Sequence, residues 1–226
     1  MGLLIFDCDG VLVDSEVVVA PVVAQLFTEC GAVIDAETVL DRYTGLANPE
    51  MIAQVGREFG VTFPDGFLEE MELAEIVALE RELQPVPGMV ELVGGLAEGD
   101  AVSLCVASSS APERIRRSLA VTGLAEFFGD CVYSASEVAR PKPAPDLFLH
   151  AASAMECAPA GCVVVEDSVF GVAAGVAAGM RVIGFTAATH GDDAADVRLL
   201  GAGAEVVAGD ARELSEVLAG FGFEVA

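Results

Sequence analysis

The stretch Leu3-Leu-Ile-Phe-Asp7-Cys-Asp9-Gly-Val-Leu-Val-Asp14-Ser15 decides the fold of this chain. Four apolar residues of strand type run directly into two aspartates that are separated by one residue. Side chains two positions apart on a strand point to the same side, so Asp7 and Asp9 are predicted to project together. They would do so at the carboxyl end of a buried strand, where open α/β sheets bind ligands. Two such carboxylates repel one another without a cation and predict a hard-metal site, although an acidic Asp-Gly turn is the plainer alternative.

Further apolar segments predict the rest of the sheet. Helical patterns lie between most of these segments, and strands that alternate with helices indicate a doubly wound, Rossmann-like parallel α/β sheet covered on both faces. The predicted strands are Leu3–Phe6, Ala101–Ala107, Cys131–Tyr133, Cys162–Val165, Arg181–Phe185 and Glu205–Val207.

Three more groups of polar residues follow such segments. Lys142 is the only lysine of the chain, and the prolines on either side of it predict a stiff backbone. Ser108 and Ser109 stand between a strand and a helix, where hydroxyls and free N–H groups can hold a phosphate, although serine is also an ordinary helix N-cap. Glu166 and Asp167 follow a run of three valines.

These acids extend the predicted metal site. Adjacent residues on a strand face opposite ways, which favours Asp167 as the direct ligand. Glu166 is then either a further ligand or a partner that acts through water. Together with Asp7 and Asp9 they form an oxygen-rich set of the kind that Mg²⁺ prefers.

The motif Asp7-Cys-Asp9-Gly-Val-Leu-Val-Asp14-Ser15 resembles the first motif of the haloacid dehalogenase-like (HAD) hydrolase superfamily, in its sugar-phosphate phosphatase and β-phosphoglucomutase-like branch. The family pattern continues with a serine, a lysine and a late acidic pair, and this chain supplies them in that order. Residues 16–85 show four helical patterns and no strand, which matches the family's small helical cap. The resemblance thus implies a catalytic core of residues 1–15 and 86–226 with the cap inserted at 16–85.

The resemblance also implies chemistry. A Mg²⁺-dependent phosphatase would use Asp7 as the nucleophile that forms an aspartyl-phosphate and Asp9 as the general acid and base. Lys142 would neutralise the nucleophile and a phosphate oxygen. Ser108, assisted by Ser109, would bind the phosphate.

The choice between phosphatase and mutase depends on the predicted cap. In the mutase-like relatives a cap histidine and a cap arginine help to hold a second phosphate, and the resemblance places Val19 and Asn48 at the matching positions of this chain. A phosphatase is therefore the favoured reading, with Gly45 and Asn48 in its specificity loop. A non-catalytic binding protein of the same fold would be expected to lack one of the acids or the lysine, and all are present.

Composition excludes several classes of partner. A net charge of −25, from 36 acidic and 11 basic residues, argues against nucleic acid and anionic membranes, which require clustered basic residues. No apolar run reaches the ~20 residues that span a bilayer, and no leader-like segment precedes the first strand. We expect a cytoplasmic protein, and the family resemblance implies a monomer that acts on a small-molecule phosphomonoester. The acidic excess suggests a salt-adapted surface as a hypothesis.

Overall fold

The computed structural model describes residues 2–44, 46, 48–99, 102–190 and 194–224. The chain divides into two compact units. The sheet unit comprises Met1–Asp14, Gln84–Thr189 and Asp193–Ala226, and the helical unit comprises Ser15–Leu83 and His190–Asp192.

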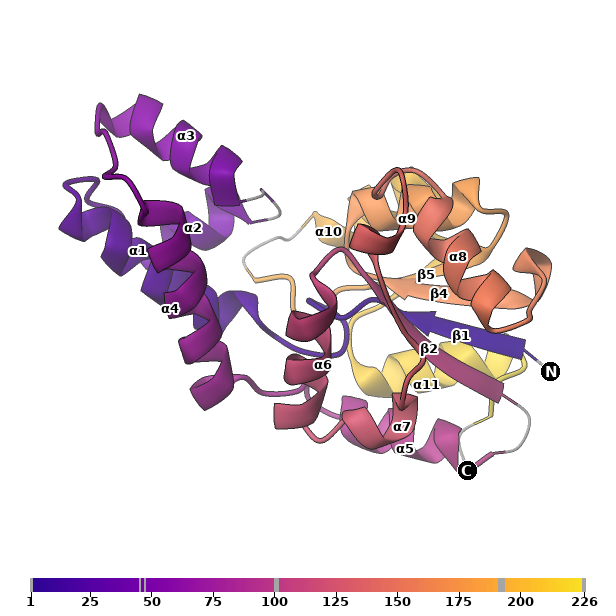
Figure 1. Ribbon diagram of the computed structural model, residues 1–226. Coiled ribbons are helices and arrows are strands. Elements are labelled where there is room, and N and C mark those ends of the chain that lie inside the picture. Colours follow the sequence, from indigo (N-terminus) through magenta and orange to yellow (C-terminus); the bar gives the residue numbers. More distant parts are fainter. Residues whose placement is uncertain (1, 45, 47, 100–101, 191–193, 225–226) are drawn as a thin grey trace. The chain divides into compact units, whose positions relative to one another are not determined.

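The sheet unit is built on a six-stranded sheet in the order β3-β2-β1-β4-β5-β6. Every pair of neighbouring strands is parallel, and Figure 1 shows β1, β2, β4 and β5 side by side with helices on both sides of them. The predicted doubly wound parallel sheet is therefore confirmed. The strands are β1 Gly2–Phe6, β2 Val102–Ser108, β3 Val132–Ser134, β4 Cys162–Glu166, β5 Arg181–Phe185 and β6 Val206–Ala208.

Several strands run one residue further toward their carboxyl ends than the sequence predicts. Ser108 still pairs with Ser134 across β2 and β3, and Glu166 still pairs with Gly184 across β4 and β5. Each of these three polar side chains is only 1% exposed. Apolar patterning underestimates the strand ends here because the polar residues that end the strands are themselves buried in the sheet.

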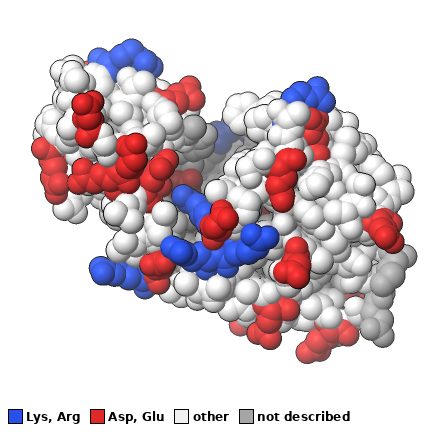
Figure 2. Space-filling model, viewed as in Figure 1, with Lys and Arg blue, Asp and Glu red and all other residues white. Residues whose placement is uncertain are grey.

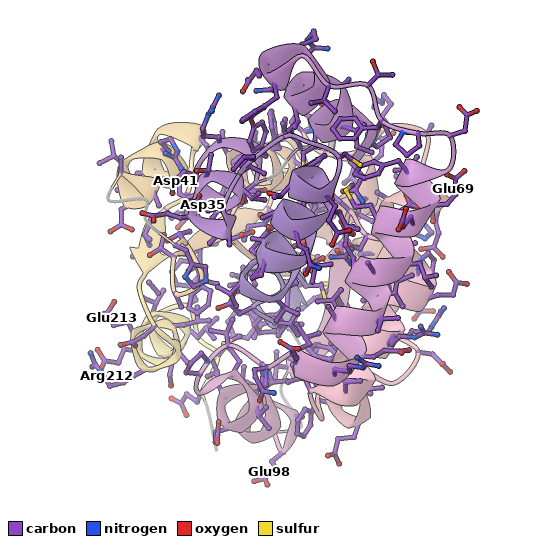
Figure 3. The ribbon with its side chains drawn as sticks, turned by 90° about the vertical axis from the view of Figure 1, so that its left-hand side faces the viewer. Asp35, Asp41, Glu69, Glu98, Arg212 and Glu213 are labelled. Atoms are coloured by element: carbon purple, nitrogen blue, oxygen red, sulfur yellow. The ribbon has the colours of Figure 1, made fainter. Side chains whose placement is uncertain are left out.

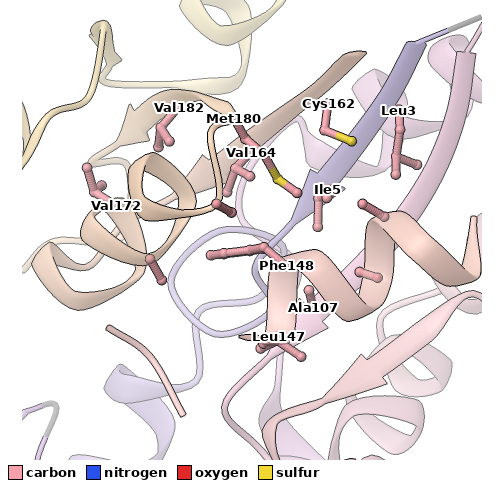
Figure 4. Close-up of a cluster of buried hydrophobic side chains, with 14 of the residues drawn as sticks. Leu3, Ile5, Ala107, Leu147, Phe148, Cys162, Val164, Val172, Met180 and Val182 are labelled. Atoms are coloured by element: carbon pink, nitrogen blue, oxygen red, sulfur yellow. The ribbon is translucent and has the colours of Figure 1, made fainter. Parts of the chain in front are cut away.

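One face of the sheet is covered by α8, α9 and α10. Leu3 and Ile5 of β1 and Val164 of β4 point toward this side and pack with Phe148 of α8 and Val172 of α9 (Figure 4). The other face carries α5, α7 and α11, and the ring of Phe128 in α7 meets Phe6 edge-on at 6.1 Å. The helices are α5 Met89–Ala97, α6 Pro112–Val121, α7 Ala125–Phe128, α8 Asp146–Ala154, α9 Val169–Ala177, α10 Ala195–Ala202 and α11 Ala211–Gly220.

The helical unit consists of α1 Glu16–Glu29, α2 Ala36–Tyr43, α3 Asn48–Phe59 and α4 Phe67–Glu82. Its core contains an aromatic group in which the rings of Phe63 and Phe67 stack at 4.5 Å and Phe27 lies against both. Tyr43 is fully buried, and its hydroxyl donates to Glu58 Oε2 at 2.7 Å. This bond ties the end of α2 to α3.

The acidic residues lie mainly at the surface. Asp35, Asp41 and Glu69 point outward from the helical unit (Figure 3), and Figure 2 shows red carboxylates spread over the face in view. Several basic side chains gather over α6, where Arg114, Arg116 and Arg117 stand. Among the described residues, no helix is both long and apolar enough to cross a membrane.

Candidate active site

Polar residues gather where three neighbouring strands end. Asp7 follows β1, Ser108 is the last residue of β2 and Glu166 is the last residue of β4. These residues are between 1% and 7% exposed. The strand order changes direction between β1 and β4, and open α/β sheets bind their ligands at such a switch point.

Lys142 joins this group from the segment before α8. Its Nζ donates to Asp7 Oδ1 and to Glu166 Oε1, both at 2.6 Å, and to the carbonyl oxygen of Ala107 at 3.1 Å. The side chain is 5% exposed, and its Nζ lies 5.0 Å from the ring centre of Phe148. Burial alone lowers the pKa of this lysine, but the two carboxylates outweigh burial and raise its pKa above the ordinary value. Lys142 is therefore charged.

The acids of the site outnumber this one ammonium. Burial raises the pKa of Asp7 to about 7, opposed by Lys142 and assisted by the charges of Glu166 and Asp9. Burial likewise raises the pKa of Asp167 well above its ordinary value, with the charges of Glu166 and Asp7 adding to the effect. Burial and the neighbouring acids thus both disfavour the charged forms of Asp7 and Asp167.

Asp167 lies directly against the turn that follows the nucleophile candidate. Gly10, which has a φ of +81°, leaves the space for the Asp167 carboxylate, because a Cβ at Gly10 would overlap that carboxylate. Only glycine adopts this φ without strain, and here only glycine also fits. The turn is closed by Gly10 N–H, which donates to the carbonyl of Val13.

The charge and the donor set fit a hard divalent cation. Among the described residues, no three His, Cys, Asp or Glu side chains form a complete metal site. Mg²⁺ does not need one, because it is usually bound by one or two carboxylates and keeps several waters. Asp7 and Asp167 supply oxygens at a buried acidic site where their charged forms are disfavoured, and a bound cation would favour those forms.

Glu166 is the predicted metal residue whose oxygens are already used by the protein. Its Oε1 accepts from Lys142, while its Oε2 accepts from both the backbone N–H and the hydroxyl of Ser168 at 2.9 Å. Ser168 also caps α9 by accepting from Gly171 N–H at 3.0 Å. This arrangement favours Glu166 as a residue that supports the metal site rather than as a direct ligand of the metal.

Asp9 is more exposed than Asp7 and faces the segment after β2. Its Oδ2 accepts from the hydroxyl of Ser110 at 2.7 Å, and Arg114 Nη2 lies 3.8 Å from its Oδ1. Ser108 is buried at the same strand end, with its Oγ accepting from Ser110 N–H at 3.2 Å, whereas Ser109 is exposed. The structure thus brings Asp7, Asp9, Ser108 and Lys142 into one unit.

The predicted specificity residues belong to the helical unit. Asn48 begins α3, and its Nδ2 donates to both carboxylate oxygens of Glu75, at 3.1 and 3.2 Å. Glu75 is only 3% exposed within α4. Gly45 lies outside the described residues.

Sequence patterns do not identify three further residues of the site. Ser110 and Arg114 contact Asp9 from about a hundred residues further along the chain, so only the fold reveals them. Gly171 faces the Glu166 carboxylate, which a Cβ at this position would overlap. The spacing of Gly171, Gly175 and Gly179 predicts close packing of α9 on the sheet. Gly175 packs in this way, because a Cβ there would overlap the side chain of Val182.

Comparison with known proteins agrees with this geometry. Residues 4–185 match the family described as haloacid dehalogenase-like hydrolase. The chain is 36% identical over 186 residues to 6-phosphogluconate phosphatase of Escherichia coli K12, covering 82% of each chain.

Two solved structures share the whole fold. A conserved haloacid dehalogenase-like protein of unknown function from Agrobacterium tumefaciens C58 has a TM-score of 0.86 and 38% identity, covering 98% of this chain and 99% of that one. A HAD family hydrolase from Deinococcus radiodurans R1, solved with bound phosphate and sodium, has a TM-score of 0.85 and 32% identity, covering 99% and 97%. This chain therefore belongs to the haloacid dehalogenase-like hydrolase family, and it is a phosphoric monoester hydrolase.

Proposed function

We propose that this protein is a Mg²⁺-dependent phosphatase of a small phosphorylated sugar or sugar acid, and that Asp7 forms an aspartyl-phosphate during turnover. The observation that carries the proposal is the contact between Asp7 Oδ1 and the chain's only lysine at 2.6 Å, with a second acid two residues on. A carboxylate can attack a phosphate monoester only where nearby positive charge offsets their mutual repulsion.

The reaction has two steps. An Asp7 carboxylate oxygen attacks phosphorus, the bond from phosphorus to the sugar oxygen breaks, and Asp9 delivers a proton to that oxygen as it leaves with its electron pair. Water then attacks the same phosphorus while Asp9 takes one of its protons. The bond from phosphorus to Asp7 breaks, phosphate leaves, and both aspartates return to their starting states.

Lys142 and the serines prepare the phosphate for attack. Lys142 would share its charge between Asp7 and a phosphate oxygen, and Glu166 would hold the ammonium in place from its other side. Ser108 and the exposed Ser109 would donate hydroxyl hydrogen bonds to the remaining phosphate oxygens. A buried donor that is already oriented, such as Ser108, stabilises charge without reorganising during the reaction.

Asp7, Asp167 and the backbone carbonyl of Asp9 would hold the metal ion. When bound, Mg²⁺ supplies positive charge that polarises the phosphoryl group. Burial, and after it the charges of neighbouring acids, raises the pKa of Asp7 and of Asp167, and a bound cation would offset both effects, which supports this assignment.

The substrate class rests on the relatives. The Escherichia coli relative is named for 6-phosphogluconate, a phosphorylated sugar acid. We propose that residues 16–85 form the cap that selects the substrate, with Gly45 and Asn48 in its specificity loop. Because its Nδ2 is held by Glu75, Asn48 would present a fixed side chain rather than a mobile one.

The test is the release of inorganic phosphate from a panel of sugar phosphates and phosphorylated sugar acids, with Mg²⁺ and with EDTA. We expect release that requires Mg²⁺ and disappears in Asp7→Asn, while the exposed Asp130→Asn control keeps wild-type activity. Acid quenching during turnover should trap a phosphorylated peptide that contains Asp7. Phosphate release at the wild-type rate by Asp7→Asn would refute the mechanism.

A further inference from the structure

The carboxylate of Asp9 is held by two side chains that the proposed reaction does not yet use. The hydroxyl of Ser110 donates to Asp9 Oδ2 at 2.7 Å, an ordinary length for an O–H···O hydrogen bond. Arg114 Nη2 lies on the other side, 3.8 Å from Oδ1. The two oxygens of one carboxylate thus face two different partners.

Ser110 is itself fixed at both of its backbone groups. Its carbonyl accepts from the hydroxyl of Ser134 at 2.7 Å, and its N–H donates to Ser108 Oγ at 3.2 Å. Ser134 is 1% exposed and is locked by a capping box, in which its N–H donates to Glu137 Oε2 at 2.7 Å and its Oγ accepts from Ser136 N–H. The ends of β2 and β3 therefore set the position of the hydroxyl that reaches Asp9.

Arg114 projects from the first turns of α6. It belongs to the group of basic residues on that helix (Figure 2), yet Arg116 and Arg117 are exposed while Arg114 is half-buried. A separation of 3.8 Å is too long for a good hydrogen bond but short enough for an ion pair. Arg114 therefore acts on Asp9 mainly through its charge.

We propose that Ser110 and Arg114 are positioning residues for Asp9, and that they decide which of its oxygens transfers the proton. Ser110 donates to Oδ2, so Oδ2 acts as an acceptor and the transferable proton is carried by Oδ1. Arg114, beside Oδ1, stabilises the negative charge that Asp9 acquires once that proton has moved to the leaving oxygen. This inference rests on the proposed function, in which Asp9 is the general acid and base.

Leaving groups of different basicity separate this role from a purely structural one. A sugar alkoxide needs a proton as it leaves, whereas nitrophenolate leaves readily without one. The parameter kcat/KM reports only the steps up to phosphorylation of Asp7, so the later attack of water does not obscure the comparison. We would compare 4-nitrophenyl phosphate with the sugar phosphate that gives the fastest release in the panel above.

The principal variants are Ser110→Ala and Ser110→Thr. General acid–base catalysis accelerates a reaction by about 10²–10⁴-fold. Ser110→Ala keeps Asp9 as the acid but removes the hydrogen bond that orients its carboxyl group. We therefore expect kcat/KM for the sugar phosphate to fall by about 10- to 50-fold, and that for 4-nitrophenyl phosphate by less than about 3-fold. Ser110→Thr retains the hydroxyl and should restore most of the loss.

Arg114→Gln should show the same selective loss, of about 5- to 20-fold. Arg116→Gln, the matched control on the same helix, should leave both substrates unaffected. Thermal unfolding of each variant checks that the fold persists.

The outcomes are distinguishable. An equal loss on both substrates in Ser110→Ala would overturn the inference, since it would assign Ser110 to the phosphate or to the loop. Unchanged activity on both substrates would overturn it too. If the wild-type protein hydrolyses neither substrate, the proposed function fails and the inference fails with it.

Discussion

The substitution Gly171→Ala offers a sharp test of how the site is supported. A methyl group at this position would overlap the carboxylate of Glu166, which is 1% exposed and has no space to withdraw into. Glu166 would have to turn away from Lys142 and from the two donors of Ser168 that hold its other oxygen. The substitution thus disturbs Lys142 by displacing Glu166, which binds it, and leaves all proposed catalytic residues unchanged.

The magnitude follows from the bonds at risk. Hydrogen bonds to charged groups contribute about 1.5–3 kcal/mol each, so losing two of the three costs about 3–6 kcal/mol. Alanine in place of glycine within a helix returns about 1 kcal/mol. The free energy of unfolding should fall by about 2–5 kcal/mol, and kcat should fall because Lys142 loses one of its two carboxylate partners.

Gly201→Ala is the matched control. Gly201 also lies within a helix, α10, but a Cβ there meets nothing within 4 Å. The same chemical change should stabilise the protein by about 0.5–1 kcal/mol at this position. Urea unfolding and phosphate release would be measured for both variants. If Gly171→Ala were as stable and as active as the wild-type protein, the claim that its missing side chain makes room for Glu166 would be wrong.

Three further predictions follow from the same structure. Lys142→Met should abolish phosphate release, because Asp7 loses its counter-charge. Turnover at the wild-type rate in this variant would contradict the role assigned to Lys142. Gly10→Ala combines a φ of +81° with a displaced Asp167, so it should lose about 1–3 kcal/mol of stability and raise the Mg²⁺ concentration needed for half-maximal activity. Hydrogen bonding from Tyr43 holds the pKa of Glu58 below its ordinary value, so Glu58 stabilises the folded state above its unfolded pKa and loses this effect as pH falls through the lowered pKa. The thermal midpoint of Glu58→Gln should therefore lie below that of the wild-type protein at pH 7, with the gap closing in acid; a gap that is constant with pH would contradict this.

The sheet could be predicted from sequence because its strands are short apolar runs that end in polar residues. Val163, Val164 and Val165 are all nearly fully buried, as a central strand of a parallel sheet requires. Asp7 and Asp9 could be singled out because Asp7 directly follows such a strand and Asp9 comes two residues later. For the buried strand residues, local patterning and tertiary structure agree.

The supports of the site could not be predicted in this way. The bond from Ser110 to Asp9 joins residues 101 positions apart, and nothing in either local sequence encodes it. The sequence shows that Glu166 is acidic, but its bond to Lys142 joins two separate segments that only the fold brings together. Sequence patterns identify the residues that can carry charge, whereas only the fold shows which of them form ion pairs with one another.

The burial of the only lysine has a consequence for the chemistry of the whole surface. Reagents and enzymes that modify lysine amines find no exposed target on the folded chain, since Lys142 is 5% exposed and bonded to two carboxylates. Apart from the amino terminus of the polypeptide, acylation can proceed only when the site itself opens. The rate at which Lys142 is acylated therefore reports how often the active site opens, at a single position and without an introduced probe.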